Sequence, residues 1–170
     1  MDQREIVKPL DADELRTAMV NASPGELDAM TLPGLHETIW AEREYLGWRD
    51  PRAPLRGYIV HWVDDRPVGI LVKAASSGMA PGNSAMCMLC HTPQPSTQVA
   101  MFTAPRAGQA GANGNTVGTY ICADLGCSII IRITPPPSAV QPDPAKIVAT
   151  RAEGLLDRVR SFTANVMRDA

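Results

Sequence analysis

The stretches "CMLC" at residues 87–90 and "CADLGC" at residues 122–127 contain all four cysteines of this 170-residue chain. Their spacing is C-x2-C, then 31 residues (91–121), then C-x4-C. A C-x2-C turn beside a strand directs two sulfurs to one point, and a second pair at a strand end completes a tetrahedron. Four thiolates without a redox function suit zinc best. We therefore predict that Cys87, Cys90, Cys122 and Cys127 bind one Zn²⁺ ion.

Two other uses of paired cysteines remain open at the level of sequence. Disulfides are typical of secreted chains, and iron–sulfur centres usually show different spacings. The first residues, "MDQREIVKPLDADEL", lack the apolar segment of a signal peptide, and no apolar run approaches a membrane span. We therefore expect a cytoplasmic protein without a membrane partner. In a reducing cytosol, paired cysteines are more often metal ligands than disulfides.

A catalytic site is not evident in the sequence. A zinc ion with four thiolate ligands has no open position, so it would be structural. The chain lacks H-E-x-x-H, the zinc deaminase pattern, a nucleophile elbow and a phosphate-binding loop. His36 and His91 are expected at the surface, and His61 in a partly buried structural position. We expect a non-enzymatic protein, with an enzyme of unrecognised active site as an alternative.

The pattern of apolar, proline and glycine residues predicts one α+β domain over residues 1–170. The N-terminal segment 1–40 is expected to be helical, with Asp11 and Ser23 as N-caps and helical character continuing toward Trp48. An antiparallel sheet, a treble-clef-like zinc finger over 84–132 and a C-terminal amphipathic helix over 143–168 follow. Asp143 is expected to cap this helix, and its predicted apolar stripe consists of Val148, Ala152, Leu155, Val159, Phe162 and Val166. The predicted β-segments are a hairpin at 55–76 and strands at 98–104 and 116–122. The glycine-rich segment 105–115 between the last two strands is expected to be a flexible loop.

The charge distribution bears on the kind of partner. A formal net charge of -2 argues against a DNA-binding protein. No acidic residue lies between Asp65 and Asp124, while that stretch carries Arg66, Lys73 and Arg106. The stretch is either an ordinary solvated surface or a docking face for an acidic partner or for RNA phosphate.

Several segments resemble the elongation factor G-binding (FusB-like) family, in its C-terminal zinc-finger domain. These segments are "MCMLCHT" at 86–92, "QVAMFTAPRAG" at 98–108 and "NTVGTYICADLGCSIIIR" at 115–132. "YLGWRDP" at 45–51 and "RPVGILVKA" at 66–74 look like the hairpin region of the same domain. The resemblance covers roughly residues 40–132 and includes the C-terminal helix, and the cysteine frame with V-x-x-F-T-A and G-x-Y-x-C is its most specific part.

The resemblance implies a treble-clef zinc finger packed on an α/β layer and a protein that binds elongation factor G, with the ribosome as a further partner. It implies Cys87, Cys90, Cys122 and Cys127 as zinc ligands. It places Phe102, Arg106, Thr119 and Tyr120 in or beside the partner-binding segments, and Arg106 with its loop is the favoured contact. Resistance proteins of the family also carry an N-terminal helical bundle. In this chain about forty residues precede the matching region, which are too few for such a bundle. Factor binding is therefore expected here rather than drug resistance, and an RNA- or ribosome-binding zinc module is the alternative.

Overall fold

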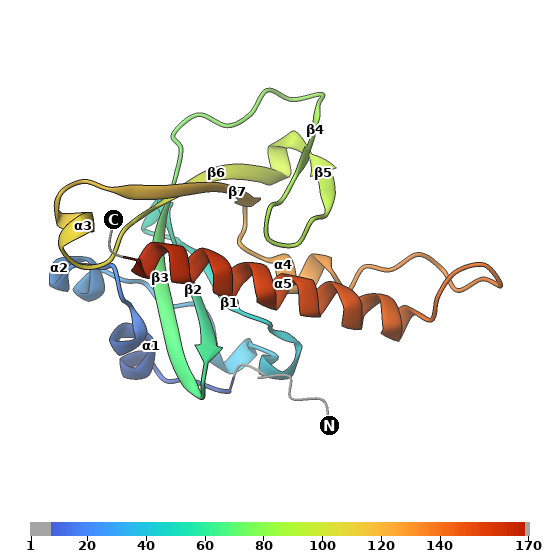
Figure 1. Ribbon diagram of the computed structural model, residues 1–170, viewed down its shortest axis with the longest axis horizontal. Helices are drawn as coiled ribbons and strands as arrows, with labels where there is room; N and C mark the ends of the chain where they lie inside the picture. The colour runs from blue at the N-terminus through green and yellow to red at the C-terminus, as the bar shows by residue number, and fades with distance from the viewer. Residues whose placement is uncertain (1–7, 169–170) are drawn as a thin grey trace.

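The computed structural model describes residues 8–168 and has two antiparallel sheets with helices on both faces of the larger one (Figure 1). The larger sheet has the order β1-β2-β3-β6-β7, and the smaller one pairs β4 with β5. The strands are β1 (Leu46–Asp50), β2 (Ala53–Val63), β3 (Arg66–Ala74), β4 (Ser84–Met86), β5 (Pro93–Pro95), β6 (Val99–Pro105) and β7 (Thr116–Cys122). The helices are α1 (Ala12–Ala18), α2 (Pro24–Asp28), α3 (Gly108–Ala112), α4 (Cys127–Ile130) and α5 (Pro144–Met167), with 3-10 turns η1 (Leu35–Glu37), η2 (Trp40–Glu42) and η3 (Ser96–Gln98). The predicted α+β class is confirmed.

The β2–β3 hairpin is the centre of the sheet. Its register runs from Arg56 opposite Lys73 to Val63 opposite Arg66. Alternate side chains of β2 face opposite sides of the sheet, because successive residues of a strand point in opposite directions. The hairpin predicted at 55–76 is confirmed. Two separate cores result, one on each face of the sheet.

The N-terminal helices cover one face. α1 begins at the predicted cap Asp11 and α2 at the predicted cap Ser23, each with a complete capping box. After α1 the chain runs beside β3, where Met19 forms a parallel bridge with Gly69. The Asn21 side chain then donates to the carbonyls of Leu71 and Pro105 and accepts from the Leu71 amide.

The prediction of helical character up to Trp48 is wrong. Residues 31–45 contain only the two 3-10 turns, and β1 begins at Leu46. Leu46 pairs with Val60 of β2, and the Trp48 indole donates to the Thr31 carbonyl at 2.9 Å. Pairing with β2 therefore overrides the helical pattern of this short segment. The division into segments 1–40, 84–132 and 143–168 stays a prediction, and residues 1–7 lie outside the described residues.

Helix α5 covers the opposite face, running across the sheet in Figure 1. It begins at Pro144 with Asp143 as N-cap, as predicted. Of the predicted apolar stripe, Val148 is half-buried, and these residues are buried: Ala152, Leu155, Val159, Phe162 and Val166. Within residues 8–168 there is no helix with the length and apolar character needed to cross a membrane.

The expectation of a flexible loop at 105–115 is wrong. The segment folds into α3, with Ala110 buried, and is closed by a hydrogen bond from the Arg106 amide to the Asn115 carbonyl at 2.9 Å. The Ala107 amide donates to the Val166 carbonyl of α5 at 3.0 Å. The glycine-rich sequence alone does not predict this contact, because the acceptor, the Val166 carbonyl, belongs to a helix far away in the chain.

Asp50 at the end of β1 is fully buried and links three parts of the chain by hydrogen bonds. Its carboxylate accepts hydrogen bonds from the amides of Thr31 and Arg52 and from the Tyr58 hydroxyl. Burial alone would raise the pKa of Asp50, but the hydrogen bonds, led by that from Thr31, hold it below 3.8. A carboxyl group with a lowered pKa stabilises the fold above its unfolded pKa, and that contribution is lost as pH falls through the folded value.

We therefore expect Asp50→Asn to lower the free energy of unfolding by about 2 kcal/mol near pH 7. The difference from wild type should shrink as pH falls below about 4, because the carboxyl group of the unfolded chain is then protonated, and it should vanish as pH falls through the lower pKa of the folded state. Urea denaturation across pH 3–7 measures this, with the exposed Asp157→Asn as control. A difference that stays constant with pH would contradict the assignment of a buried, ionised carboxylate.

Candidate metal centre

The first cysteine pair lies in a tight turn between β4 and β5. The His91 amide donates to the Cys87 carbonyl at 2.9 Å and closes this turn, which we call the knuckle (residues 87–91). The amides of Leu89 and Cys90 point at the Cys87 sulfur, each at 3.4 Å. The knuckle is tied to β7 by a hydrogen bond from the Met88 amide to the Tyr120 carbonyl at 2.8 Å. Main-chain geometry therefore aims the first two thiols inward.

The second cysteine pair lies where β7 ends and α4 begins. Cys122 is the last residue of β7, as predicted, and Cys127 is the first residue of α4. The connection turns sharply: the Leu125 amide donates to the Cys122 carbonyl, and the Asp124 carboxylate accepts from the Gly126 amide, both at 2.8 Å. Leu125 takes a left-handed conformation with φ 56°. The wider C-x4-C spacing thus still returns its two sulfurs to one place.

All four predicted ligands meet in one buried cluster. Their Sγ atoms all lie within 4.8 Å of one another. The Cys87–Cys127 and Cys90–Cys122 Sγ distances are both 3.6 Å, and all four cysteines are free. A disulfide needs about 2.05 Å between sulfurs. A tetrahedral site with metal–sulfur bonds of about 2.3 Å separates its sulfurs by about 3.8 Å, so the cluster fits such a metal ion.

The four thiols shift one another's pKa values. Contact with the Cys122 thiol lowers the pKa of Cys90 far below that of an ordinary thiol and raises the pKa of Cys127. Close thiols share protons unequally because adjacent thiolates repel one another. A bound metal cation removes this repulsion and allows all four sulfurs to be ionised.

A buried leucine locks the cluster to the larger sheet. The Leu125 side chain packs where β1 and β2 each carry a glycine, Gly47 and Gly57. A β-carbon at position 57 would lie 2.5 Å from Leu125 Cδ1, and one at position 47 would overlap the Leu125 carbonyl oxygen. The two glycines form a notch for Leu125, here called the glycine notch. The notch exists because neither position 47 nor position 57 carries a β-carbon.

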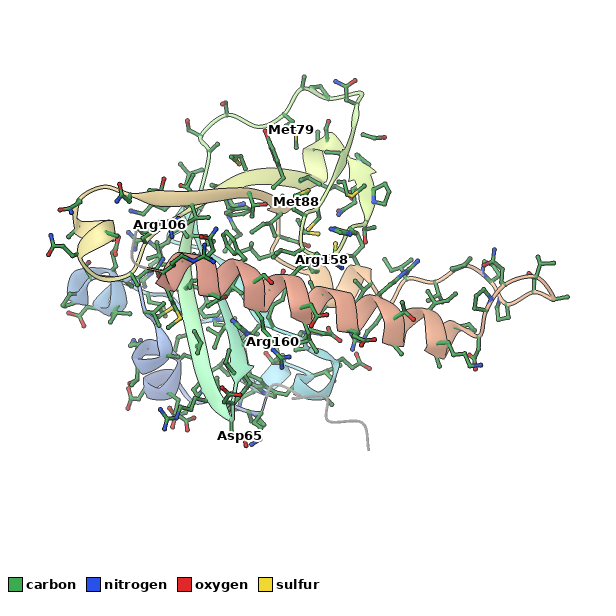
Figure 2. All side chains as sticks on the ribbon, in the orientation of Figure 1. Asp65, Met79, Met88, Arg106, Arg158 and Arg160 are labelled. Atoms are coloured by element: carbon green, nitrogen blue, oxygen red, sulfur yellow. The ribbon has the colours of Figure 1, made fainter. Side chains whose placement is uncertain are left out.

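Arginine side chains hold the finger segments by their main-chain carbonyls. Arg49 of β1 donates to the Ala123 carbonyl at 2.7 Å, and Arg151 of α5 to the Ile133 carbonyl at 2.8 Å. Arg158 of α5 donates to the Leu89 carbonyl of the knuckle, and Figure 2 shows it below Met88. A β-carbon on Gly154 would lie 2.9 Å from the Arg158 guanidinium, so this helix-weakening glycine makes room for the arginine.

A buried ion pair adds a further tie. Arg132, just after α4, donates to both carboxylate oxygens of Glu44 at 3.0 and 2.9 Å. The Glu44 amide donates to the Ser128 hydroxyl at 3.0 Å. Glu44 is only 7% exposed, and a two-pronged pair of this kind fixes both position and orientation. The finger therefore shares its supports with β1 and α5.

The predicted partner-binding residues are placed very differently from one another. Phe102 is fully buried, with the Arg49 guanidinium 5.2 Å from its ring centre. Thr119 is half-buried, and Tyr120 is 43% exposed. Arg106 donates to the main-chain and side-chain oxygens of Asn165 near the end of α5, where Figure 2 shows it. The structure thus leaves Tyr120 at the surface and engages Arg106 within the chain.

The histidines lie outside the cluster. His91 is exposed, as predicted, and takes a left-handed conformation with φ 55°. His61 is fully rather than partly buried, and its Nε2 lies 2.8 Å from the Thr163 hydroxyl of α5. Burial, and then Arg160, lower the pKa of His61 to about 4, so it is neutral near pH 7. His36 is exposed on η1.

Comparison with known families gives a match to the FBP C-terminal treble-clef zinc-finger over residues 14–166. The chain belongs to this family. The match confirms the resemblance inferred from the sequence, including nearly all of α5, and it extends before residue 40 to include most of α1.

A solved structure, "Structure of the fusidic acid resistance protein FusC", is similar with 21% identity and a TM-score of 0.46. The match covers 68% of this chain and 56% of that protein. A search of curated proteins finds no match.

Sequence reasoning missed several residues that build the centre. Gln94 donates its side-chain amide to the Cys122 sulfur at 3.2 Å and is only 7% exposed. Leu125 and the glycine notch were also missed, although glycines at positions 47 and 57, within otherwise apolar strand sequences, are a usable signal of close approach. The arginine contacts to carbonyls leave no signal in sequence.

Proposed function

We propose that this protein is a zinc protein that binds elongation factor G through the surface of its finger. The observation that carries the proposal is the cluster of four buried cysteines in a chain of the FBP treble-clef zinc-finger family. We propose Cys87, Cys90, Cys122 and Cys127 as the four ligands of Zn²⁺. The sulfur-only donor set favours zinc over harder cations. Such a centre offers no open position for substrate, so its role is to hold the finger together.

The proposed partner comes from the sequence resemblance to elongation factor G-binding proteins. An apolar patch on the finger supports a protein partner. Met86, Met88 and Tyr120 are 47%, 48% and 43% exposed, and the Met88–Tyr120 hydrogen bond brings knuckle and β7 together there. Methionine and tyrosine are common at adaptable protein interfaces. We call these three residues the knuckle patch.

Two of the three cations in the stretch without acidic residues, Lys73 and Arg106, are engaged within the chain, which favours a protein over RNA as the partner. Lys73 pairs with Glu26 at 3.4 Å, and Arg106 is bound to α5. RNA binding relies on several cations that reach phosphates. An exposed apolar patch, in a chain whose cations are engaged in this way, fits a protein surface better.

Mechanistically, a binder promotes release of the factor from the ribosome when it prefers a conformation that the ribosome holds poorly. Differential affinity of this kind shifts the population of the factor. The centre contributes by keeping the knuckle patch in one shape before binding, which lowers the entropic cost of association.

We expect Tyr120→Ser to weaken binding of purified elongation factor G by more than about tenfold, because the substitution removes the largest side chain of the knuckle patch. Isothermal titration calorimetry with zinc-loaded protein measures this. The matched control is Val140→Ser in the linker before α5, which removes an apolar side chain that is 90% exposed. Equal affinities of both variants and wild type would place the interface elsewhere.

Absence of binding by the wild type would remove elongation factor G as the partner. Retention of nuclease-sensitive RNA at low salt, lost steeply as salt rises, would then favour the RNA-binding alternative.

A further inference from the structure

Tyr45 carries a buried hydroxyl group that has no hydrogen-bond partner. Its side chain is only 1% exposed, immediately before β1, and it belongs to the same core as the four cysteines. Among residues 8–168, three buried side-chain atoms lack a partner: Tyr45 Oη, His61 Nδ1 and Trp62 Nε1. An unpaired buried hydroxyl costs free energy, so its position calls for an explanation.

The surroundings of Tyr45 point toward the sulfur cluster. A β-carbon at Gly47 would lie 2.5 Å from Tyr45 Cε2 and would also overlap the Leu125 carbonyl oxygen, so the ring lies beside the C-x4-C connection. The Glu44 amide donates to the Ser128 hydroxyl at 3.0 Å, so the residue before Tyr45 contacts the residue after Cys127. A tyrosine hydroxyl normally carries its proton near pH 7, so it acts as a donor toward a negatively charged neighbour.

The sulfurs differ in how many N–H donors reach them. Cys87 accepts from two amides of the knuckle, and Cys122 accepts from Gln94. Cys90 and Cys127 each have one other thiol at 3.6 Å, Cys122 and Cys87 respectively, and within residues 8–168 neither sulfur has an N–H donor. A divalent ion with four thiolates has a net charge of minus two, and buried negative charge is stabilised by hydrogen-bond donors.

We infer that the Tyr45 hydroxyl donates a hydrogen bond to the Cys127 thiolate of the metal-loaded centre. The inference rests on the proposed zinc centre. Metal binding releases the thiol proton of Cys127 and leaves a negatively charged sulfur, which is a much better acceptor than a thiol. Tyr45 is thus a positioning residue of the centre, matched to the sulfur of the second cysteine pair that lacks an N–H donor among the described residues.

Tyr45→Phe tests this inference, because phenylalanine keeps the ring and removes only the donor. Apparent zinc affinity is measured by competition with a chelator, and the thiolate-to-metal charge-transfer band by absorption of the Co²⁺-loaded protein. We expect the variant to bind one metal ion, with affinity lowered by about 10–100-fold and a shifted band. The matched control is Tyr58→Phe, which removes a buried hydroxyl that donates to Asp50 at 3.2 Å. That control should lose stability while both metal readouts stay at wild-type values.

A measurement on wild-type protein removes any dependence on the folding of the variant. In protein loaded with ¹¹³Cd²⁺, the Tyr45 hydroxyl proton should give a slowly exchanging NMR resonance coupled to the metal through the sulfur. Absence of this resonance, or Tyr45→Phe with wild-type affinity and band, would overturn the inference and leave the zinc centre standing. A wild type that binds none of the three metals would overturn the centre and the inference together.

Discussion

Cys127→Ser is expected to abolish stable metal binding and to unfold the finger. Cys127 is fully buried, begins α4 and lies 3.6 Å from the Cys87 sulfur. A serine hydroxyl is a poor ligand for zinc and leaves a polar group inside an apolar core. We expect zinc affinity to fall by more than about 100-fold, because losing a ligand should lower the affinity more than losing a hydrogen bond to a ligand does. The melting temperature should fall by more than about 10 °C, equivalent to roughly 4 kcal/mol for a chain of this size.

Metal analysis after gel filtration and thermal melts with and without chelator measure both effects. Chelator should lower the melting temperature of the wild type and leave that of Cys127→Ser unchanged. Met88→Ser is the control, since this exposed side chain lies between two ligands and should leave the metal content unchanged. A Cys127→Ser protein with one zinc ion and a wild-type melt would show that Cys127 is not a ligand.

The second large effect is expected for Gly47→Ala. A β-carbon there would overlap the Leu125 carbonyl oxygen and lie 2.5 Å from the Tyr45 ring, and neither neighbour is the end of a flexible side chain. Either β1 or the C-x4-C connection must shift, so we expect a loss of about 3 kcal/mol in the free energy of unfolding. Zinc affinity should fall as well, because the displaced connection carries Cys122 and Cys127 at its ends.

Gly25→Ala is the matched control for this prediction. Gly25 lies in α2, and a β-carbon there meets no atom within 4 Å. Alanine has the higher helix propensity, so this variant should be more stable by up to about 1 kcal/mol. Urea denaturation of the two variants in zinc-containing buffer separates them. Equal stabilities would show that the glycine notch can widen without cost.

The features that could be predicted from sequence are those fixed by local chemistry. Asp11, Ser23 and Asp143 cap their helices because short polar side chains satisfy free amides at a helix start. The strands at 98–104 and 116–122 follow from β-propensity, and the cysteine spacing implied one cluster. These signals depend on residues within a few positions of each other, so they can be recognised in a single sequence without knowledge of the fold.

The features that could not be predicted depend on distant neighbours. The segment at 31–48 has a helical pattern, yet β1 forms in it because β2 offers an unpaired edge. The segment at 105–115 looks flexible, yet Arg106 and Ala107 bind the end of α5. Tyr45 lies in the segment expected to be helical, and its place beside the cysteine cluster could not be foreseen. Each outcome is decided by packing between elements far apart in the chain, which local patterns do not record.

The arginine contacts along α5 have a mechanical consequence. Arg151, Arg158 and Asn165 follow each other at seven-residue intervals, which return to nearly the same face of a helix about 10 Å further along. They contact, in order, the chain after α4, the knuckle and Arg106. A rigid rod attached at three points constrains all three to move together. A displacement of the knuckle would therefore also displace the tip of the β6–β7 hairpin. Inserting a single residue into α5 would rotate the attachment points that follow it by about 100°, away from their partners.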